Sequence, residues 1–118
     1  MTRTIRAGGL IVKDPNSSEL FAVDWDKEHL RAGVQIASQS FFIVGPDAIL
    51  TKDNEALLTA AQATTQFERT VTVDNRGTQL RLLAGTLGAK YTVTNRITTA
   101  ESPAQVKDAS FKVLIQSR

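Results

Sequence analysis

The sequence predicts an all-β fold, an antiparallel β-sandwich with one possible short helix. Short segments with strand character recur along most of the 118 residues, and turn-forming residues separate them. The pattern lacks the alternating helical crossovers that a parallel α/β sheet would need. Hydrophobic residues make up 42% of the chain and charged residues 22%, which is typical of one globular domain with its own core.

Five strand candidates bounded by turn residues lie before residue 84. In chain order they cover residues 10–13, 20–24, 35–44, 67–73 and 79–83. Asp14-Pro15-Asn16 stops the first, and Gly45-Pro46 follows the third. A turn over residues 74–77 is expected to join the last two as a hairpin.

Two segments favour helix over strand by their composition. Residues 25–31 follow Asp24, a good N-cap, and contain no β-branched residue, so one or two helical turns are expected there. Residues 53–63 also favour helix by propensity, although a loop packed on the edge of the sandwich would give the same pattern.

Two late segments, residues 91–99 and 110–116, carry the clearest strand pattern. Both alternate apolar and polar residues with the period of two that a half-buried strand requires. The apolar faces are expected to hold Tyr91, Val93 and Ile97 in the first segment, and Phe111, Val113 and Ile115 in the second.

No linker composition divides the chain, so residues 10–118 are expected to form a single domain behind an N-terminal arm over residues 1–9. The arm is basic and contains Gly8 and Gly9, which suits a segment that orders on a partner. A frayed terminus with incidental charges explains the same pattern.

Composition excludes several classes of function. The chain has no cysteine and one histidine, which excludes a disulfide framework, a thiolate nucleophile, sulfur-ligated zinc and a multi-histidine metal cluster. We predict no catalytic, cofactor-binding or metal-binding residues and no enzymatic activity. With 14 basic against 12 acidic residues, no nucleic-acid partner is expected. The apolar runs are too short for a membrane helix or a signal peptide, so neither a membrane nor secretion is expected.

Residues 24–29 gather acidic groups around the only tryptophan and the only histidine. One interpretation is an aromatic platform for a sugar, or carboxylates placed for acid-base chemistry. Carboxylates that are near neighbours on one short turn rarely span a substrate, however. We therefore expect Trp25 to fill the core, and His29 to be a surface or packing residue.

Tyr91 lies near the start of a late strand, just after the turn at Gly88. This position is typical of the tyrosine corner of immunoglobulin-like sandwiches, in which the hydroxyl bonds back to a nearby backbone group. An ordinary core tyrosine would give the same short pattern. Val93 would then occupy the position of the second cysteine of antibody domains, which suits a reducing compartment.

Several motifs, taken in order, resemble small structural proteins of tailed bacteriophages. They are Lys13-Asp14-Pro15, Val23-Asp24-Trp25, the segment from Ala84 to Thr99 and the last strand, and their order matches from Ile11 to Ile115. The resemblance implies an immunoglobulin-like β-sandwich of the virion, without enzymatic activity, encoded among head and neck genes. Two departures stand out: Glu28-His29-Leu30 replaces a usual second tryptophan, and residues 47–66 look like an expansion.

The resemblance leads to the hypothesis of a capsid decoration or cement protein, made in the host bacterial cytoplasm, that binds the assembled major capsid shell. One alternative is a head-tail connector or tail structural protein. Another is an immunoglobulin-like glycan-binding adhesion module. The expected partners are the major capsid protein or other virion proteins. A homo-oligomer could form through an exposed edge strand, although the sequence does not indicate which edge is open.

Two regions are expected to contact the partner, residues 2–9 and residues 47–66, because exposed loops and termini commonly carry binding functions. The individual residues expected there are Arg3, Ile5, Arg6, Asp53 and Glu55.

Overall fold

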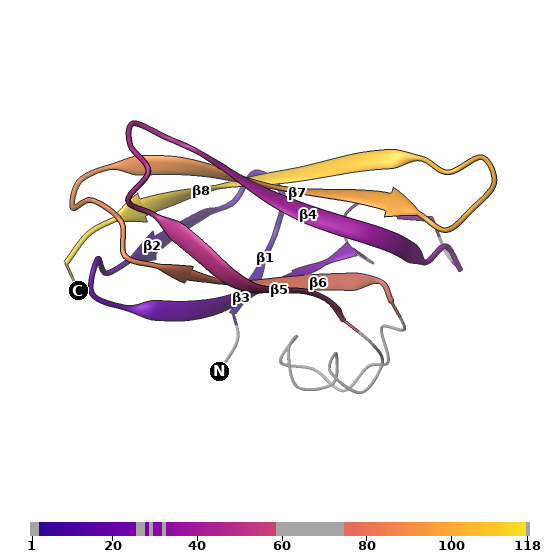
Figure 1. Ribbon diagram of the computed structural model, residues 1–118, viewed down its shortest axis with the longest axis horizontal. Helices are drawn as coiled ribbons and strands as arrows, with labels where there is room; N and C mark the ends of the chain where they lie inside the picture. Colours follow the sequence, from indigo (N-terminus) through magenta and orange to yellow (C-terminus); the bar gives the residue numbers. More distant parts are fainter. Residues whose placement is uncertain (1–2, 26–27, 29, 32, 59–74, 118) are drawn as a thin grey trace.

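The computed structural model describes residues 3–25, 28, 30–31, 33–58 and 75–117. Two four-stranded sheets pack face to face (Figure 1), and the described part of the chain contains no α-helix. The predicted all-β sandwich is therefore confirmed. The strands are β1 (Arg3–Ile5), β2 (Leu10–Lys13), β3 (Ser18–Asp24), β4 (Ile36–Val44), β5 (Thr51–Leu58), β6 (Gly77–Leu83), β7 (Lys90–Thr99) and β8 (Val106–Ile115).

One sheet has the strand order β1-β3-β6-β5 and the other β2-β8-β7-β4. Antiparallel pairing joins β3 to β6, β5 to β6, β4 to β7 and β7 to β8. The two short strands nearest the N-terminus pair in parallel instead, β1 with β3 and β2 with β8. Each sheet is thus an antiparallel core with one short parallel strand at its edge.

Most of the predicted strands are confirmed. The segments 10–13, 20–24, 35–44, 79–83, 91–99 and 110–116 fall within or nearly within β2, β3, β4, β6, β7 and β8. β8 begins earlier than expected, because Val106 and its neighbours continue the pairing with β7. The predicted strand 67–73 lies outside the described residues, as does the start of the predicted turn 74–77.

The helix expected over residues 53–63 is wrong for the residues that the structure describes. Residues 53–58 belong to β5, which pairs with β6, and residues 59–63 lie outside the description. A register shift between Asp53 and Ala56, with Asn54 at φ 52°, accommodates the polar stretch in the strand. Pairing with a neighbouring strand here outweighs helix propensity, which is only a weak preference.

In the segment 25–31, where one or two helical turns were expected, the described residues form a single tight turn and no α-helix. The Glu28 amide donates to the Trp25 carbonyl at 3.1 Å, and Arg31 and Val34 close a second turn further on. The Glu28 side chain of this segment bonds to the chain that follows β1.

The N-terminal segment, expected to be an arm, is built into the sandwich. Arg3–Ile5 pairs with β3, and the Ile5 side chain is buried in the core. Beyond the strand, the buried carboxylate of Glu28 accepts hydrogen bonds from Arg6 Nε and from the Ala7 amide. The Gly8 amide donates to the Ser110 carbonyl at 2.7 Å. Apolar burial and these bonds hold the segment against both sheets.

The core lies between the two sheets and is rich in aromatic side chains. Its largest fully buried members include Trp25, Tyr91, Phe21 and Phe111. Trp25 is 1% exposed, which confirms its predicted role in the core.

Asn95, on β7, points into this core and joins both sheets through its side-chain amide. Its Oδ1 accepts hydrogen bonds from Trp25 Nε1 at 2.9 Å and from the Thr78 hydroxyl, on β6, at 2.6 Å. Its Nδ2 donates to Gln39 Oε1 at 3.2 Å and to the Ser40 carbonyl at 3.0 Å, both on β4. An amide has two acceptor and two donor sites, so this buried group is fully satisfied.

Replacing this amide by a methyl group, Asn95→Ala, is expected to lower the free energy of unfolding by about 3 kcal/mol, because the Trp25 and Thr78 donors lose their acceptor and a cavity remains. Urea unfolding measures the change. Thr98→Ala, on the solvent-facing side of the same strand, is the matched control and should cost far less. Equal losses in the two variants would contradict a special role for Asn95.

Candidate functional site

Three connections meet at one end of the sandwich, which we call the loop end. They are the β2–β3 turn (14–17), the β4–β5 loop (45–50) and the β6–β7 loop (84–89). Figure 1 shows all three at the left, beside the C-terminus. Hydrogen bonds from buried or strand residues tie these connections to one another.

Asp47 is the centre of the β4–β5 loop. Its Oδ1 accepts from the Tyr91 hydroxyl and, at 3.0 Å, from the Ile49 amide, while its Oδ2 accepts from the Thr86 hydroxyl at 2.7 Å. These three hydrogen bonds hold the pKa of the Asp47 carboxyl below its ordinary value of 3.8, and the bond from Tyr91 lowers it most. One carboxylate therefore binds the β4–β5 and β6–β7 loops together.

Tyr91 makes a backbone bond of the kind that the first of its two interpretations, the tyrosine corner, expected. Its hydroxyl accepts from the Thr86 amide at 3.2 Å, five residues upstream, and donates to Asp47. The Tyr91 ring also requires glycine at position 45, because a Cβ there would lie 2.3 Å from the Tyr91 Cδ1 atom. Only glycine lets the β4–β5 loop approach the ring this closely.

Lys13 binds the β2–β3 turn to the β6–β7 loop. Its side chain is fully buried, and its Nζ donates to the Asp14 carbonyl at 2.8 Å and to the Ala84 carbonyl at 2.7 Å. The lysine of the Lys-Asp-Pro motif thus links the β2–β3 turn to the β6–β7 loop. Next to it, Gly85 has φ 109°, and a Cβ there would lie 2.7 Å from the Ile115 side chain.

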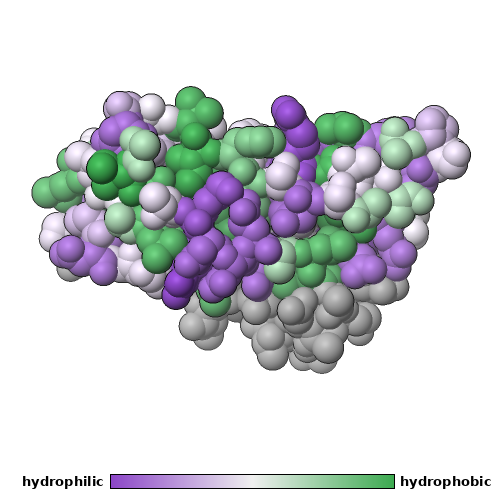
Figure 2. Space-filling model, in the orientation of Figure 1, coloured by the Kyte–Doolittle hydropathy of each residue, from purple (hydrophilic) through white to green (hydrophobic). Residues whose placement is uncertain are grey.

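This framework presents apolar side chains to solvent. Val44 is 69% exposed, Ile49 is 52% exposed and Leu87 is 62% exposed, all in or beside the tied loops. Figure 2 shows several apolar groups at the same end of the molecule. Exposed apolar side chains on a rigid support are typical of a protein-binding surface.

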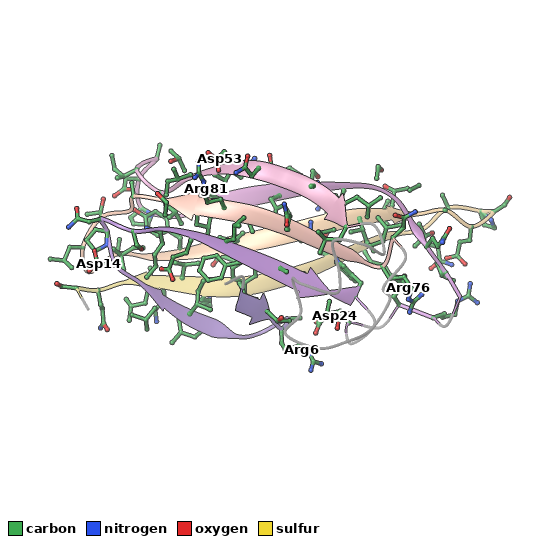
Figure 3. All side chains as sticks on the ribbon, turned by 90° about the horizontal axis from the view of Figure 1, so that it is seen from below. Arg6, Asp14, Asp24, Asp53, Arg76 and Arg81 are labelled. Atoms are coloured by element: carbon green, nitrogen blue, oxygen red, sulfur yellow. The ribbon has the colours of Figure 1, made fainter. Side chains whose placement is uncertain are left out.

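Residues 47–50 of the predicted contact region 47–66 lie at the loop end, but the individual residues predicted as partner contacts do not gather there. Ile5 is buried in the core, so its side chain is not available to a partner. Arg6 pairs with Glu28. Arg3 belongs to β1, at one edge of its sheet, whereas Asp53 and Glu55 belong to β5 at the opposite edge. Figure 3 shows Asp53 and Arg6 on opposite flanks.

The acidic residues of β5 pair with nearby basic residues. Asp53 accepts two hydrogen bonds from Arg81, at 2.8 Å and 2.6 Å, which lower the pKa of the Asp53 carboxyl (Figure 3). Glu55 accepts from Lys52 Nζ at 2.9 Å. Their role as partner contacts stays a prediction.

Other kinds of site find no support in the described residues. They contain no cavity of ligand size and no group of three or more metal-ligating side chains. Nor do they include a helix long and apolar enough to cross a membrane. Trp25 cannot serve as a sugar platform because it is buried, and His29 lies outside the description.

Comparison with known proteins gives a family and a fold. The family model of Gp77, described as podophage GP4 fiber-tail adaptor protein gp77, matches residues 13–114. Among solved structures, the cysteine protease inhibitor EhICP2 from Entamoeba histolytica is similar with a TM-score of 0.53 and 7% sequence identity, covering 98% of this chain and 95% of that one. At this identity the likeness concerns the fold alone. The search of curated proteins found no match.

The Asp47 carboxylate predicts a defined response to acid. Because its pKa is lower in the folded state, its contribution to stability is present above the ordinary value of 3.8 and is lost as the pH falls below it. Asp47→Asn removes this contribution. We expect the variant to lose less unfolding free energy than the unaltered protein between about pH 5 and about pH 2.

Thermal unfolding monitored by circular dichroism at several pH values measures this difference. Asp53 and Asp108, whose carboxyl pKa values are also lowered, provide the acid sensitivity common to both proteins. Parallel pH profiles for the two proteins would contradict the assignment to Asp47.

Proposed function

The chain belongs to the podophage fiber-tail adaptor family gp77, and we propose on this basis that it joins a tail fibre to the tail through protein–protein contacts. Membership in the family makes it a structural protein of a phage virion. The match over residues 13–114 carries the proposal, because it covers nearly the whole sandwich.

The family favours the tail over the capsid shell. Of the two virion locations that the sequence left open, the head-tail or tail alternative agrees with an adaptor, and capsid decoration is not confirmed. We therefore propose tail or fibre proteins as the partners, in place of the major capsid protein.

We propose that this role needs no enzymatic activity. An adaptor works by presenting rigid surfaces, and the tied loops at the loop end give such a surface without ordering new segments on binding. Repetition of one modest contact around a symmetric tail would provide tight attachment through multivalency.

We also infer that the sandwich is immunoglobulin-like. The order β1-β3-β6-β5 corresponds to the order ABED, and β4, β7 and β8 correspond to CFG. The hydroxyl of Tyr91, bonded to the Thr86 amide at the start of strand β7, supports the same inference.

The location is tested on assembled virions. Particles carrying a tagged copy of the chain are labelled with gold and imaged, and the copy number is compared with that of the major capsid protein by quantitative mass spectrometry. We expect gold at the tail and far fewer copies than the capsid protein. Labelling spread over the head shell would overturn the tail proposal and restore capsid decoration.

The contact surface is tested with two matched variants. Leu87→Asp, at the loop end, is expected to weaken fibre attachment by about tenfold or more, because it places a charge in an apolar contact. Val106→Asp is the control, since Val106 is equally exposed, at 63% against 62%, but lies at the opposite end. Attachment is measured as fibre retained on purified tails. Equal retention for both variants would remove the loop end from the interface.

A further inference from the structure

We propose that β4 is an open pairing edge through which two copies of this chain associate, strand β4 against strand β4, in an antiparallel two-fold dimer. This inference does not depend on the adaptor function. It rests on a comparison of the four strand edges that the sandwich exposes.

One sheet has β1 and β5 as its edge strands, and the other sheet has β2 and β4. β1 has three residues and β2 has four, which is too short for extensive pairing. β5 has eight residues, but its register shifts between Asp53 and Ala56 and it carries Lys52, Asp53 and Glu55. Short length, bulges and charges are the features that protect edges from pairing.

β4 has none of this protection over most of its length. It spans nine residues, Ile-Ala-Ser-Gln-Ser-Phe-Phe-Ile-Val, with no charge and no proline. Its single irregularity lies at the start, between Ile36 and Ser38, and leaves seven residues, 38–44, in regular register with β7. Among the described residues, 38–44 form backbone ladder bonds with β7 alone, and Figure 1 shows β4 at the near side of its sheet.

The occupant of this edge must itself be an open, extended and uncharged strand. In the described part of the chain, β4 is the strand that meets this requirement, so the chain supplies its own complement. Pairing of two β4 strands is self-complementary, because the same residues face one another across a two-fold axis. It would extend the sheet from four strands to eight.

The side chains beside the edge are compatible with this pairing. On the outer face of β4 lie Ser38, Ser40, Phe42 and Val44, with Phe42 44% exposed and Val44 69% exposed. On that face the Arg96 guanidinium, on the neighbouring strand β7, pairs with Asp108 and stacks on the Phe42 ring at 5.2 Å, and the Lys112 ammonium donates to the Thr92 hydroxyl. Across the dimer, serine and apolar side chains therefore meet without opposing like charges.

The mass of the purified full chain in solution tests the proposal first. Sedimentation velocity over a range of protein concentrations is expected to show a species of twice the 12.8 kDa chain mass. Ser40 lies at the centre of β4, so Ser40→Lys brings two ammonium groups together near the two-fold axis. This variant should raise the dissociation constant by about tenfold or more. Ser110→Lys, on β8 of the same face, is the control and should leave it unchanged.

The chain has no cysteine, so a nitroxide label can be placed at one position by Ser40→Cys or Ser110→Cys. Position 110 lies two strands further from the edge, and strands are spaced about 4.8 Å apart. The distance between labels of the two copies should therefore be roughly 20 Å longer for position 110 than for position 40. Circular dichroism and urea unfolding of each variant establish that it is folded.

A chain that stays monomeric at high micromolar concentration would overturn the proposal. A dimer that tolerates Ser40→Lys, or that gives the shorter label distance at position 110, would overturn the assignment to β4. If a fibre or tail segment binds the β4 edge of a monomer instead, the edge is open but its occupant is a different protein, and the dimer is refuted.

Discussion

The buried amide of Asn95 is the interaction on which the packing of the two sheets depends. It takes both donors from the side of β3 and β6, Trp25 and Thr78, and gives both of its own protons to β4. The Trp25 and Thr78 donors and the Asn95 amide would otherwise be buried without a partner, which is costly in a core. The same network fixes register, because a slip of one residue along β7 would turn Asn95 to solvent and an exposed side chain into the core.

The strands that the sequence predicted are those that bury one face, since alternation of apolar and polar residues records that burial directly. β5 was missed because its sequence, Thr-Lys-Asp-Asn-Glu-Ala-Leu-Leu, has little alternation and is stabilised by pairing with β6. Within β5, Asp53 accepts hydrogen bonds from Arg81, which lies 28 positions further along the chain. Likewise β1 is three residues long, and its place is set by β3 and by Glu28, far from it in sequence. Local propensity carries no information about such distant partners.

At the loop end, too, the sequence could predict interactions between residues close in the chain but not those between distant residues. Tyr91 was predictable, because the tyrosine and its backbone partner are close in sequence. Asp47 was not, since 44 positions separate it from Tyr91, and neither was the burial of Lys13, whose second acceptor is 71 positions away. Gly45 was a usable signal: a glycine directly after a strand indicates a close approach, although it does not name the ring that approaches. Among the residues predicted as contacts, Ile5 is buried in the structure, and the charged groups of Arg6, Asp53 and Glu55 already form ion pairs within the fold.

The loop end and the β4 edge meet at Val44 and otherwise occupy different parts of the molecule, and this arrangement bears on how an adaptor could work. β4 runs along the side of the sandwich, and the loop end begins where β4 stops, at Val44. In an antiparallel pair of β4 strands, the Val44 end of one copy lies toward the Ile36 end of the other. The two loop ends would therefore point away from each other. Pairing through the edge would leave Ile49 and Leu87 of both copies accessible and would turn one binding surface into two, facing opposite directions, as a link between two assemblies requires.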